Sequence, residues 1–246
     1  MIEKYLLNVN GFETEASYDS EDVENVFIPL IHKFNEIYEE KGRRVFIFMA
    51  APPGLGKTTL TLFLEQLAVE QGITQLQAVG MDGFHYDQQY LDNTLIERNG
   101  NVFPLAAIKG SKDTFDIDKL CQKLQQASEG DCYWPLYDRN IHNPVEDAVE
   151  INKDIILFEG NYLLLDDKNW ARVREYCDYS VLLRCQPELL EERLINRKVR
   201  GNVSLEFAKK WYQQVDGQNV NTVLNNSIDA DCVIIYDGEH YKFQTF

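Results

Sequence analysis

Short apolar runs alternate with amphipathic stretches along most of the chain. Five of the runs have the length and composition of buried strands: residues 46–50, 75–81, 155–158, 179–183 and 232–236. Apolar residues recur at helical spacing between them, over residues 58–71, 115–128, 187–199 and 204–216. Strands that alternate with helices favour a parallel sheet with helices on both faces. The pattern therefore predicts a three-layer α/β/α fold with a mainly parallel sheet.

Two further elements precede this alternation. Residues 5–18 alternate apolar and polar positions around Asn10-Gly11, the dipeptide that best suits a tight hairpin turn. Apolar residues at helical spacing follow over residues 23–38, with capping residues at 19–22 and Gly42 at the end. The sequence predicts an N-terminal β-hairpin and then a helix.

The chain of 246 residues is long enough for one large α/β domain. We expect residues 1–42 to form an extension of a core that spans residues 43–246. Within the core, residues 85–150 are polar, aromatic and rich in Asp, Asn and Pro. This region is expected to form loops and short elements over the carboxyl ends of the strands, where open α/β sheets bind ligands.

The charge of the chain limits its partners. The formal net charge is −16 and the isoelectric point is near 4.6, so broad contact with nucleic-acid phosphates is not expected. Five cysteines, without a C-x-x-C pair, indicate reduced thiols and neither a zinc site nor a disulfide framework. No signal peptide or membrane span is apparent, so we expect a cytoplasmic protein without a membrane partner. The oligomeric state is left open, a homodimer included.

The strand at residues 46–50 leads into a glycine-rich loop and the start of a helix. Backbone N–H groups beside closely spaced glycines curl around phosphate oxygens, and the helix adds its positive end. Lys57 reaches the β and γ phosphates, and Thr58 offers its hydroxyl to Mg²⁺. The sequence therefore predicts a nucleoside triphosphate site that consists of Pro53, Gly54, Leu55, Gly56, Lys57, Thr58 and Thr59.

Ala51 stands where the G-x-x-x-x-G-K-[ST] pattern has a glycine. Alanine disfavours positive φ, so the loop must begin in a conformation that alanine tolerates. The alternative interpretation of the segment is a Gly/Pro turn with an incidental lysine.

Two acidic residues come at the ends of predicted strands. Asp82 should share a crevice with Lys57, where its carboxylate could act as the base for a substrate hydroxyl. The alternative is that Asp82 merely opens a turn with Gly83. Glu159 should help Thr58 to hold Mg²⁺, and the alternative is a solvated carboxylate at a strand end.

The densest basic cluster lies in residues 188–202. Arg193 and Arg197 are one helical turn apart, and they could close over a triphosphate as a lid that neutralises charge during transfer. Neighbouring glutamates offer ordinary i,i+4 partners, so a solvated helix face is the alternative.

Other polar residues are candidates for binding a substrate. His85 follows Asp82 closely, where it could contact a hydroxyl group or simply pack. Residues 109–116 and 135–142 mix aromatic, acidic and basic side chains that suit a polyhydroxylated ligand. Loops of this composition are usually ordinary solvent-exposed surface. The evidence for a ligand site in these loops therefore depends on the other motifs.

Together and in this order, these segments resemble the phosphoribulokinase/uridine kinase family of P-loop kinases, which includes a bacterial pantothenate kinase. Within it they are most similar to a nucleoside/nucleotide kinase-like branch, some of whose members are labelled fructose-transport kinases. The resemblance covers roughly residues 20–236. The motifs that carry it are Ala51–Thr59, Met81–His85, Lys109-Gly110 with Thr114–Asp116, Tyr137–Arg139 with His142–Pro144, Phe158–Leu164, and Arg193-Leu194 with Arg197 and Gly201.

The resemblance implies a five-stranded parallel sheet, with Asp82 as catalytic base and with Arg193 and Arg197 in the lid. It further implies that the acceptor site is bordered by Lys109, Tyr137, Arg139 and His142, with His85 close by. Ala51 and the N-terminal extension depart from the family pattern. The acceptor loops match none of the uridine, ribulose-phosphate or pantothenate patterns, so the resemblance does not identify the substrate of this protein.

The first functional hypothesis is an ATP- and Mg²⁺-dependent kinase that phosphorylates a hydroxyl group of a small metabolite, a sugar or a nucleoside. A vitamin similar to pantothenate is the alternative substrate. The second hypothesis is a regulatory protein that binds a nucleotide without phosphorylating a metabolite, and a third is a degenerate kinase that only binds ligand. The chain lacks the Asn-Lys-x-Asp segment with which GTPases bind guanine.

Overall fold

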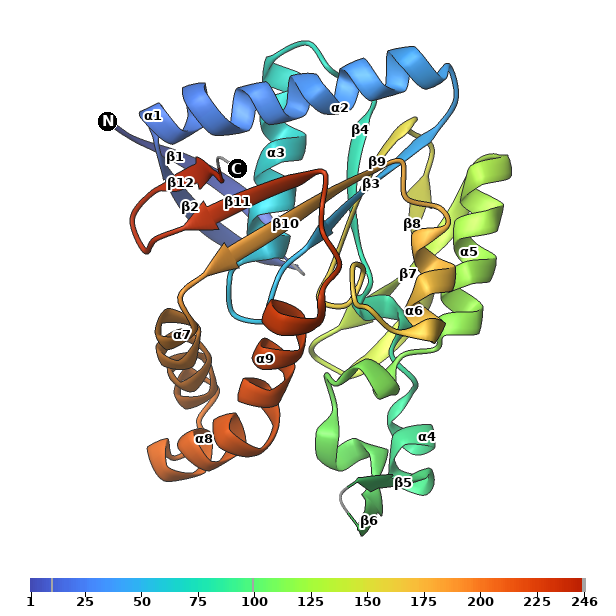
Figure 1. Ribbon diagram of the computed structural model, residues 1–246, viewed down its shortest axis with the longest axis vertical. Coiled ribbons are helices and arrows are strands. Elements are labelled where there is room, and N and C mark those ends of the chain that lie inside the picture. The colour runs from blue at the N-terminus through green and yellow to red at the C-terminus, as the bar shows by residue number, and fades with distance from the viewer. Residues whose placement is uncertain (10, 99, 245–246) are drawn as a thin grey trace.

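The computed structural model describes residues 1–9, 11–98 and 100–244, and its centre is a six-stranded sheet in the order β12-β11-β10-β3-β9-β4 (Figure 1). Five strands are parallel, and β12 pairs antiparallel with β11. This arrangement confirms the predicted, mainly parallel sheet. The resemblance implied five strands, and the structure adds a sixth, β12, at the edge. The bounds are β3 Val45–Ala50, β4 Leu76–Gly80, β9 Ile155–Gly160, β10 Tyr179–Cys185, β11 Cys232–Tyr236 and β12 Tyr241–Phe243.

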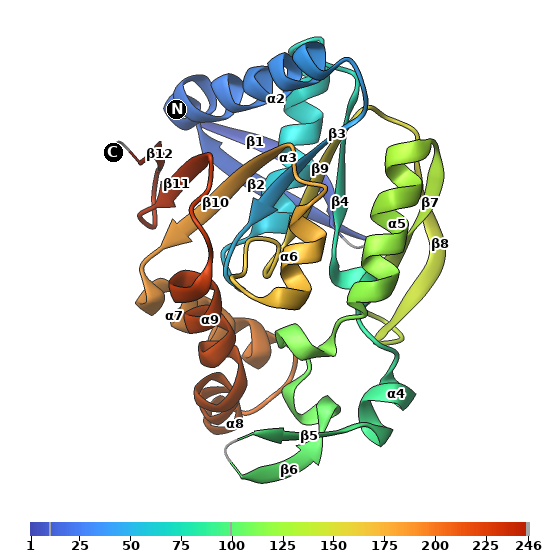
Figure 2. The same ribbon diagram turned by 45° about the vertical axis from the view of Figure 1, so that its right-hand side comes forward.

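Helices cover both faces of the sheet (Figure 2). Successive residues of a strand point to opposite faces, so Ile47 belongs to one buried cluster and Phe48 to the other. Helices α2 and α3 pack on the Ile47 side, and α5 and α6 pack on the Phe48 side. Every residue of β3 is buried, as a central strand between two helical layers requires. The helices span α2 Ile28–Lys41, α3 Lys57–Glu70, α5 Ile117–Glu129 and α6 Lys168–Arg174.

The predicted N-terminal hairpin is confirmed. Strands β1 (Ile2–Val9) and β2 (Phe12–Asp19) pair antiparallel. Tyr18 stacks on Phe63 of α3 with 4.1 Å between ring centroids, which fixes the hairpin to the α3 side of the sheet. Asn10 of the predicted Asn10-Gly11 turn lies outside the described residues.

The helix after the hairpin also begins and ends as predicted. Asp19 accepts a hydrogen bond from the Glu21 N–H group, and Gly42 ends the helix with φ of +62°. A short α1 (Ser20–Asp22) and a π-helical turn (Val23–Phe27) precede α2. Pro29 lacks the N–H group that a regular α-helix would use at this point, which agrees with a wider turn just before it.

Residues 132–151 form a long antiparallel hairpin, where the sequence predicted loops and short elements. Strand β7 (Cys132–Asp138) pairs with β8 (Asn143–Ile151), and the register shifts at Pro135. The proline and the charged outer positions interrupt the alternation that signals a strand, so the expectation for this stretch was wrong. The elements that precede α5 in this region are short as expected, among them α4 Gln88–Asn93, β5 Leu95–Arg98 and β6 Asn101–Pro104.

The last helical segment is longer than the sequence predicted. Helix α7 (Pro187–Arg200) is followed by α8 (Leu205–Trp211) and a π-helical turn (Tyr212–Asp216). The chain then continues as α9 (Gly217–Asn226), whose polar sequence has a weak apolar pattern. Figures 1 and 2 both place α7 to α9 opposite α4, β5 and β6 at one end of the molecule. None of the helices in the described ranges is long and apolar enough to cross a membrane.

Close packing holds the turn that carries Asp82. Asp82–Phe84 form a single 3₁₀ turn just beyond β4, and Gly83 is buried against β7. A Cβ atom at Gly83 would lie 2.2 Å from the carbonyl oxygen of Pro135. Because only glycine lacks this atom, Gly83 allows the turn to lie directly on the β7–β8 hairpin.

We expect Gly83→Ala to lower the free energy of unfolding in urea by about 1–3 kcal/mol, because the added methyl group meets backbone atoms that have no room to move. Gly130→Ala is the matched control, since Gly130 has extended backbone with φ of 166° and a methyl group added there would have no atom within 4 Å. Equal effects of the two substitutions would contradict this account of the turn.

Candidate functional site

A cleft of about 810 Å³ opens at the carboxyl ends of the parallel strands, and we call it the main cleft. It lies between the phosphate loop, the Asp82 turn, the β7–β8 turn and helices α7 to α9. Fourteen residues that the sequence predicted for the site line it: Pro53, Gly54, Gly56, Lys57, Thr58, Thr59, Asp82, His85, Lys109, Tyr137, Arg139, His142, Arg193 and Arg197. The structure therefore brings together residues from distant segments, whose individual roles stay predictions.

The backbone of the phosphate loop adopts positive φ angles at its glycines. Gly54 and Gly56 have φ of +88° and +91°, a region that residues with a side chain rarely adopt. Ala51 does not have positive φ; its N–H group donates to Gly160 and continues the β3–β9 pairing at 3.4 Å. The loop thus begins in a conformation that alanine tolerates. Leu55, predicted to contact the nucleotide, has its side chain in the core.

Thr58 and Glu159 form the predicted metal pair. The Thr58 hydroxyl donates to Glu159 Oε1 at 2.6 Å, and Lys57 Nζ lies 3.7 Å from Glu159 Oε2. Burial raises the pKa of Glu159, and the charge of Lys57 and the Thr58 hydrogen bond only partly offset this effect.

These residues fit Mg²⁺, because the buried Glu159 Oε2 has no hydrogen-bond partner and oxygen ligands suit this cation. Within the described ranges, no group of three or more His, Cys, Asp or Glu side chains is arranged to hold a metal ion. Any Mg²⁺ at Thr58 and Glu159 would therefore take most of its ligands from phosphates and water, as is usual for this ion.

Asp82 lies at the centre of a cluster of positive charges. Its Oδ2 atom is 3.3 Å from Arg139 Nη2, and its side chain keeps 35% of its surface exposed. Burial favours the neutral acid, but Lys57 and other nearby cations outweigh it and hold the pKa of Asp82 below its usual value. The carboxylate is therefore ionised at neutral pH and can accept a hydrogen bond from a hydroxyl group.

His85 packs among rings beside Asp82. Its ring centroid lies 3.8 Å from that of Phe115 and 5.5 Å from that of Tyr137. Its Nδ1 atom is buried and has no hydrogen-bond partner. Burial lowers the pKa of His85 to about 4, although the Asp82 carboxylate acts in the opposite direction. His85 is thus neutral at pH 7 and lies at the wall of the main cleft.

Lys109 presents an uncompensated charge to the main cleft. Its ammonium group donates to Gln88 Oε1 at 2.8 Å and to the His142 carbonyl at 3.0 Å. It also lies 5.3 Å from the centre of the Tyr137 ring. In the part of the chain that the structure describes, no carboxylate lies within 4.0 Å of this group. Lys109 is therefore available to an anionic or oxygen-rich ligand.

Arg193 reaches from α7 to the phosphate loop. It donates to the Leu55 carbonyl at 3.5 Å and to the Tyr236 hydroxyl at 3.0 Å, and its guanidinium lies 4.9 Å from the Tyr236 ring centre. Arg197 is exposed and lines the same cleft one turn further along. Neither arginine is within 4.0 Å of a carboxylate among the described residues, so the neighbouring glutamates that could have been their i,i+4 partners do not pair with them. Whether the two arginines act as a lid stays a prediction.

Several residues that line the main cleft were missed by the sequence analysis. Four come from the segment of α7 to α9, and the buried Asn161 Oδ1 atom lacks a hydrogen-bond partner. Asp216 is largely desolvated, which raises its pKa although Lys198 is near. Asn161 belongs to the Phe158–Leu164 motif, which could have identified it. The residues of α7 to α9 showed only the apolar periodicity of a helix, which does not mark binding residues. The missed residues whose side chains have polar groups are Gln88, Asn161, Lys198, Trp211, Asp216 and Asn219.

We expect His85 to remain neutral between about pH 5.5 and 8, so its ring signals in NMR spectra should not titrate in this range. His240 is the internal control, because hydrogen bonding to Asp22 raises its pKa and its ring should gain a proton as the pH falls. A midpoint for His85 above about pH 6 would show that its surroundings are more polar than the structure implies.

Comparison with known proteins agrees with this geometry. The model of the phosphoribulokinase/uridine kinase family matches residues 46–238, so the chain belongs to this family of P-loop kinases. Members of the family are ATP-dependent kinases of small molecules.

Three similar proteins illustrate the range of the match. "Uncharacterized protein YggC" of Escherichia coli is 40% identical over 233 residues, which cover 94% of each chain. A uridine kinase of Clostridium perfringens is 28% identical over 210 residues, 81% of this chain and 90% of that one. The crystal structure of a "putative fructose transport system kinase" from Silicibacter sp. TM1040 has a TM-score of 0.74 and 27% identity, covering 86% of this chain and 98% of that one.

Proposed function

We propose that this protein is an ATP- and Mg²⁺-dependent kinase that transfers the γ-phosphate to a hydroxyl group of a small metabolite. A sugar or a nucleoside is the proposed acceptor, and a vitamin similar to pantothenate is the alternative. The observation that carries the proposal is that Lys57 of the phosphate loop and the ionised Asp82 line one cleft of about 810 Å³. This volume is within the range of small-molecule sites.

Transfer of a phosphoryl group needs positioning and charge neutralisation more than strong bases. Lys57, Arg193 and Arg197 would neutralise the charge that spreads over the phosphate oxygens in the transition state. Thr58 and Glu159 would hold Mg²⁺, which would supply further positive charge to offset that of the phosphates. Asp82 would align the acceptor hydroxyl and take its proton, while Lys57 and Arg139 hold the carboxylate in its ionised form.

The acceptor would lie between the Asp82 turn and the β7–β8 turn. Lys109, Tyr137 and His142 border this part of the main cleft, with neutral His85 behind them. A lysine, a tyrosine hydroxyl and ring faces together suit a ligand with several oxygen atoms. The uncompensated Lys109 further favours an acceptor that carries a partial or full negative charge near it.

We expect Asp82→Asn to bind ATP as tightly as the unchanged protein but to transfer phosphate about 10²–10⁴-fold more slowly, because the amide cannot accept the proton. ADP release with the true acceptor measures the rate, and calorimetry measures ATP binding. Asp92→Asn, an exposed change on α4, is the control. Near-normal turnover of Asp82→Asn would exclude Asp82 as the base.

Lys109→Gln should raise KM for the acceptor by roughly 10- to 100-fold, since a hydrogen bond to a charged group contributes about 1.5–3 kcal/mol. KM for ATP should change little, because Lys109 lies on the acceptor side. Lys119→Gln removes a surface lysine that pairs with Glu146 and serves as control. An equal rise in both KM values would place Lys109 with the nucleotide instead.

Coupled detection of ADP release across sugars, nucleosides and vitamins would identify the acceptor. We expect one chemical class to stimulate turnover well above the slow hydrolysis of ATP alone. Tight ATP binding without stimulation by any acceptor would favour the regulatory protein that the sequence left as an alternative.

A further inference from the structure

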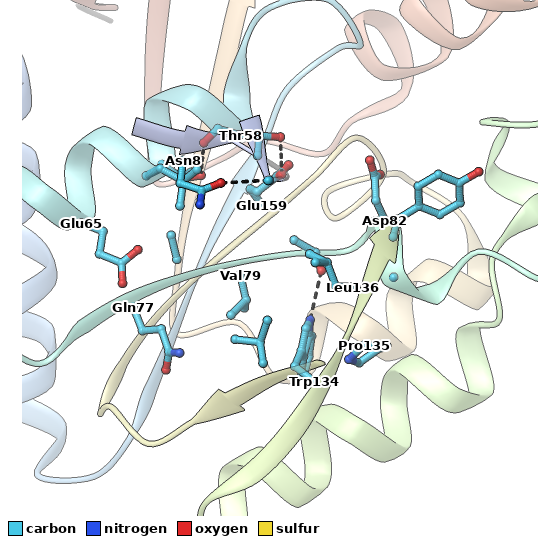
Figure 3. Close-up of a pocket in the computed structure, with 18 residues that line it drawn as sticks. Asn8, Thr58, Glu65, Gln77, Val79, Asp82, Trp134, Pro135, Leu136 and Glu159 are labelled. Atoms are coloured by element: carbon cyan, nitrogen blue, oxygen red, sulfur yellow. Dashed lines mark hydrogen bonds between the residues drawn. The ribbon is translucent and has the colours of Figure 1, made fainter. Parts of the chain in front are cut away.

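A second cavity, of about 420 Å³, lies beside the main cleft between α3, β4 and β7 (Figure 3). We call it the β4 cavity. Thr58, Asp82 and Tyr137 line both hollows, so the two are neighbours at the reacting centre. Apart from Glu159, the remainder of its lining has no part in the proposed phosphate transfer, and it includes Leu62, Glu65, Gln77, Val79, Trp134 and Leu136.

The two hollows differ in charge. The β4 cavity is lined by three carboxylates, Glu65, Asp82 and Glu159, and no Lys, Arg or His is found among its described lining residues. Asp82 and Glu159 already lie near Arg139 and Lys57, whereas no cationic group of the described residues lies within 4.0 Å of Glu65. The Glu65 end of the cavity would therefore repel a phosphate or carboxylate group and attract a positive one. The main cleft has the opposite character, with the cationic residues Lys57, Lys109, Arg139, Arg193, Arg197 and Lys198.

Glu65 is a carboxylate that forms no ion pair with the described residues. It lies on α3 two turns beyond Thr58, about 10 Å along the helix axis, and in Figure 3 it faces the hollow from the end opposite Asp82. Burial raises the pKa of Glu65 more than the neighbouring Ala78 backbone, on the open edge of β4, and the more distant Lys153 lower it. No cationic group of the described residues lies within 4.0 Å of it.

Apolar side chains form part of the wall of the β4 cavity, next to polar ones such as Thr61 and Gln77. Trp134 is held in place by its indole N–H group, which donates to the Gly80 carbonyl at 3.0 Å. Leu136 is 40% exposed, and Val79 and Leu62 complete the apolar surface. A ligand that fills this space therefore gains from an apolar body as well as from a positive group.

We propose that the β4 cavity is a binding site for an organic amine, with its ammonium group at Glu65 and its apolar body against Trp134 and Leu136. The site goes beyond the proposed kinase activity and does not depend on it. Its occupant would border Asp82 and Thr58, so binding there would also reach the reacting centre.

Three probes of the same shape but different charge test the proposal: benzylamine, benzyl alcohol and benzoate. The three tryptophans of the chain provide separate NMR reporters: the buried Trp134 lines the β4 cavity, Trp211 lines the main cleft, and the equally buried Trp170 lines neither. We expect benzylamine to shift the Trp134 indole signal saturably, with a Kd on the order of 1 mM for so small a ligand. Benzyl alcohol should bind about tenfold more weakly, and benzoate should leave this signal unchanged.

Substitution of Glu65 tests the position of the ammonium group. Glu65→Gln should reduce benzylamine affinity at least about tenfold, to the level of benzyl alcohol, since it removes the charge and keeps the shape. Glu70→Gln, at an exposed position on the same helix, should change nothing. ATP binding measured by calorimetry should be the same in both variants, which separates this site from the nucleotide site.

Three results would each overturn the proposal: no saturable shift of the Trp134 signal, similar affinity for the three probes, or unchanged benzylamine affinity in Glu65→Gln. If Glu65→Gln does not fold, the ranking of the three probes on the unchanged protein decides. None of these results bears on phosphate transfer, so the kinase proposal and the amine site fail independently.

Discussion

Opposite charges held close together at the ends of three adjacent parallel strands are the constraint on which the site depends. The chain leaves β3 into Lys57 and Thr58, Glu159 is the last residue but one of β9, and β4 leads into Asp82. The buried Glu159 and the half-buried Asp82 would be costly without a cation, and the lysine would be costly without them. Because the strands run parallel, their carboxyl ends meet at one edge and the charges compensate one another there.

The β7–β8 hairpin is as much a part of this arrangement as the sheet. Its backbone contacts Gly83, which fixes the Asp82 turn, and its connecting turn supplies Arg139 to the Asp82 carboxylate. Trp134 of the same hairpin binds the Gly80 carbonyl on the open edge of β4. The hairpin thus closes the edge of the sheet, positions Asp82 and forms one wall of both hollows.

The distribution of charge separates two kinds of binding surface in one molecule. In a chain of net charge −16, the lysines and arginines of the main cleft form a local positive region that would draw phosphates toward the loop. The β4 cavity next to it carries carboxylates and apolar side chains instead. The boundary between the two regions passes through Asp82 and Thr58, which line both.

The sequence by itself determined the elements with strong local patterns. The phosphate loop, the alternation of strands and helices, the N-terminal hairpin and the acidic residues at strand ends were all predicted, because glycine spacing and apolar periodicity are properties of neighbouring residues. Only the tertiary structure decided the β7–β8 hairpin, whose proline obscured its alternation, and the extent of α9. It also decided which polar residues meet: Tyr236 beside Arg193, Trp211 and Asp216 in the main cleft, and Glu65 in the β4 cavity. These residues come together through packing across the sheet, over separations along the chain that no local pattern records.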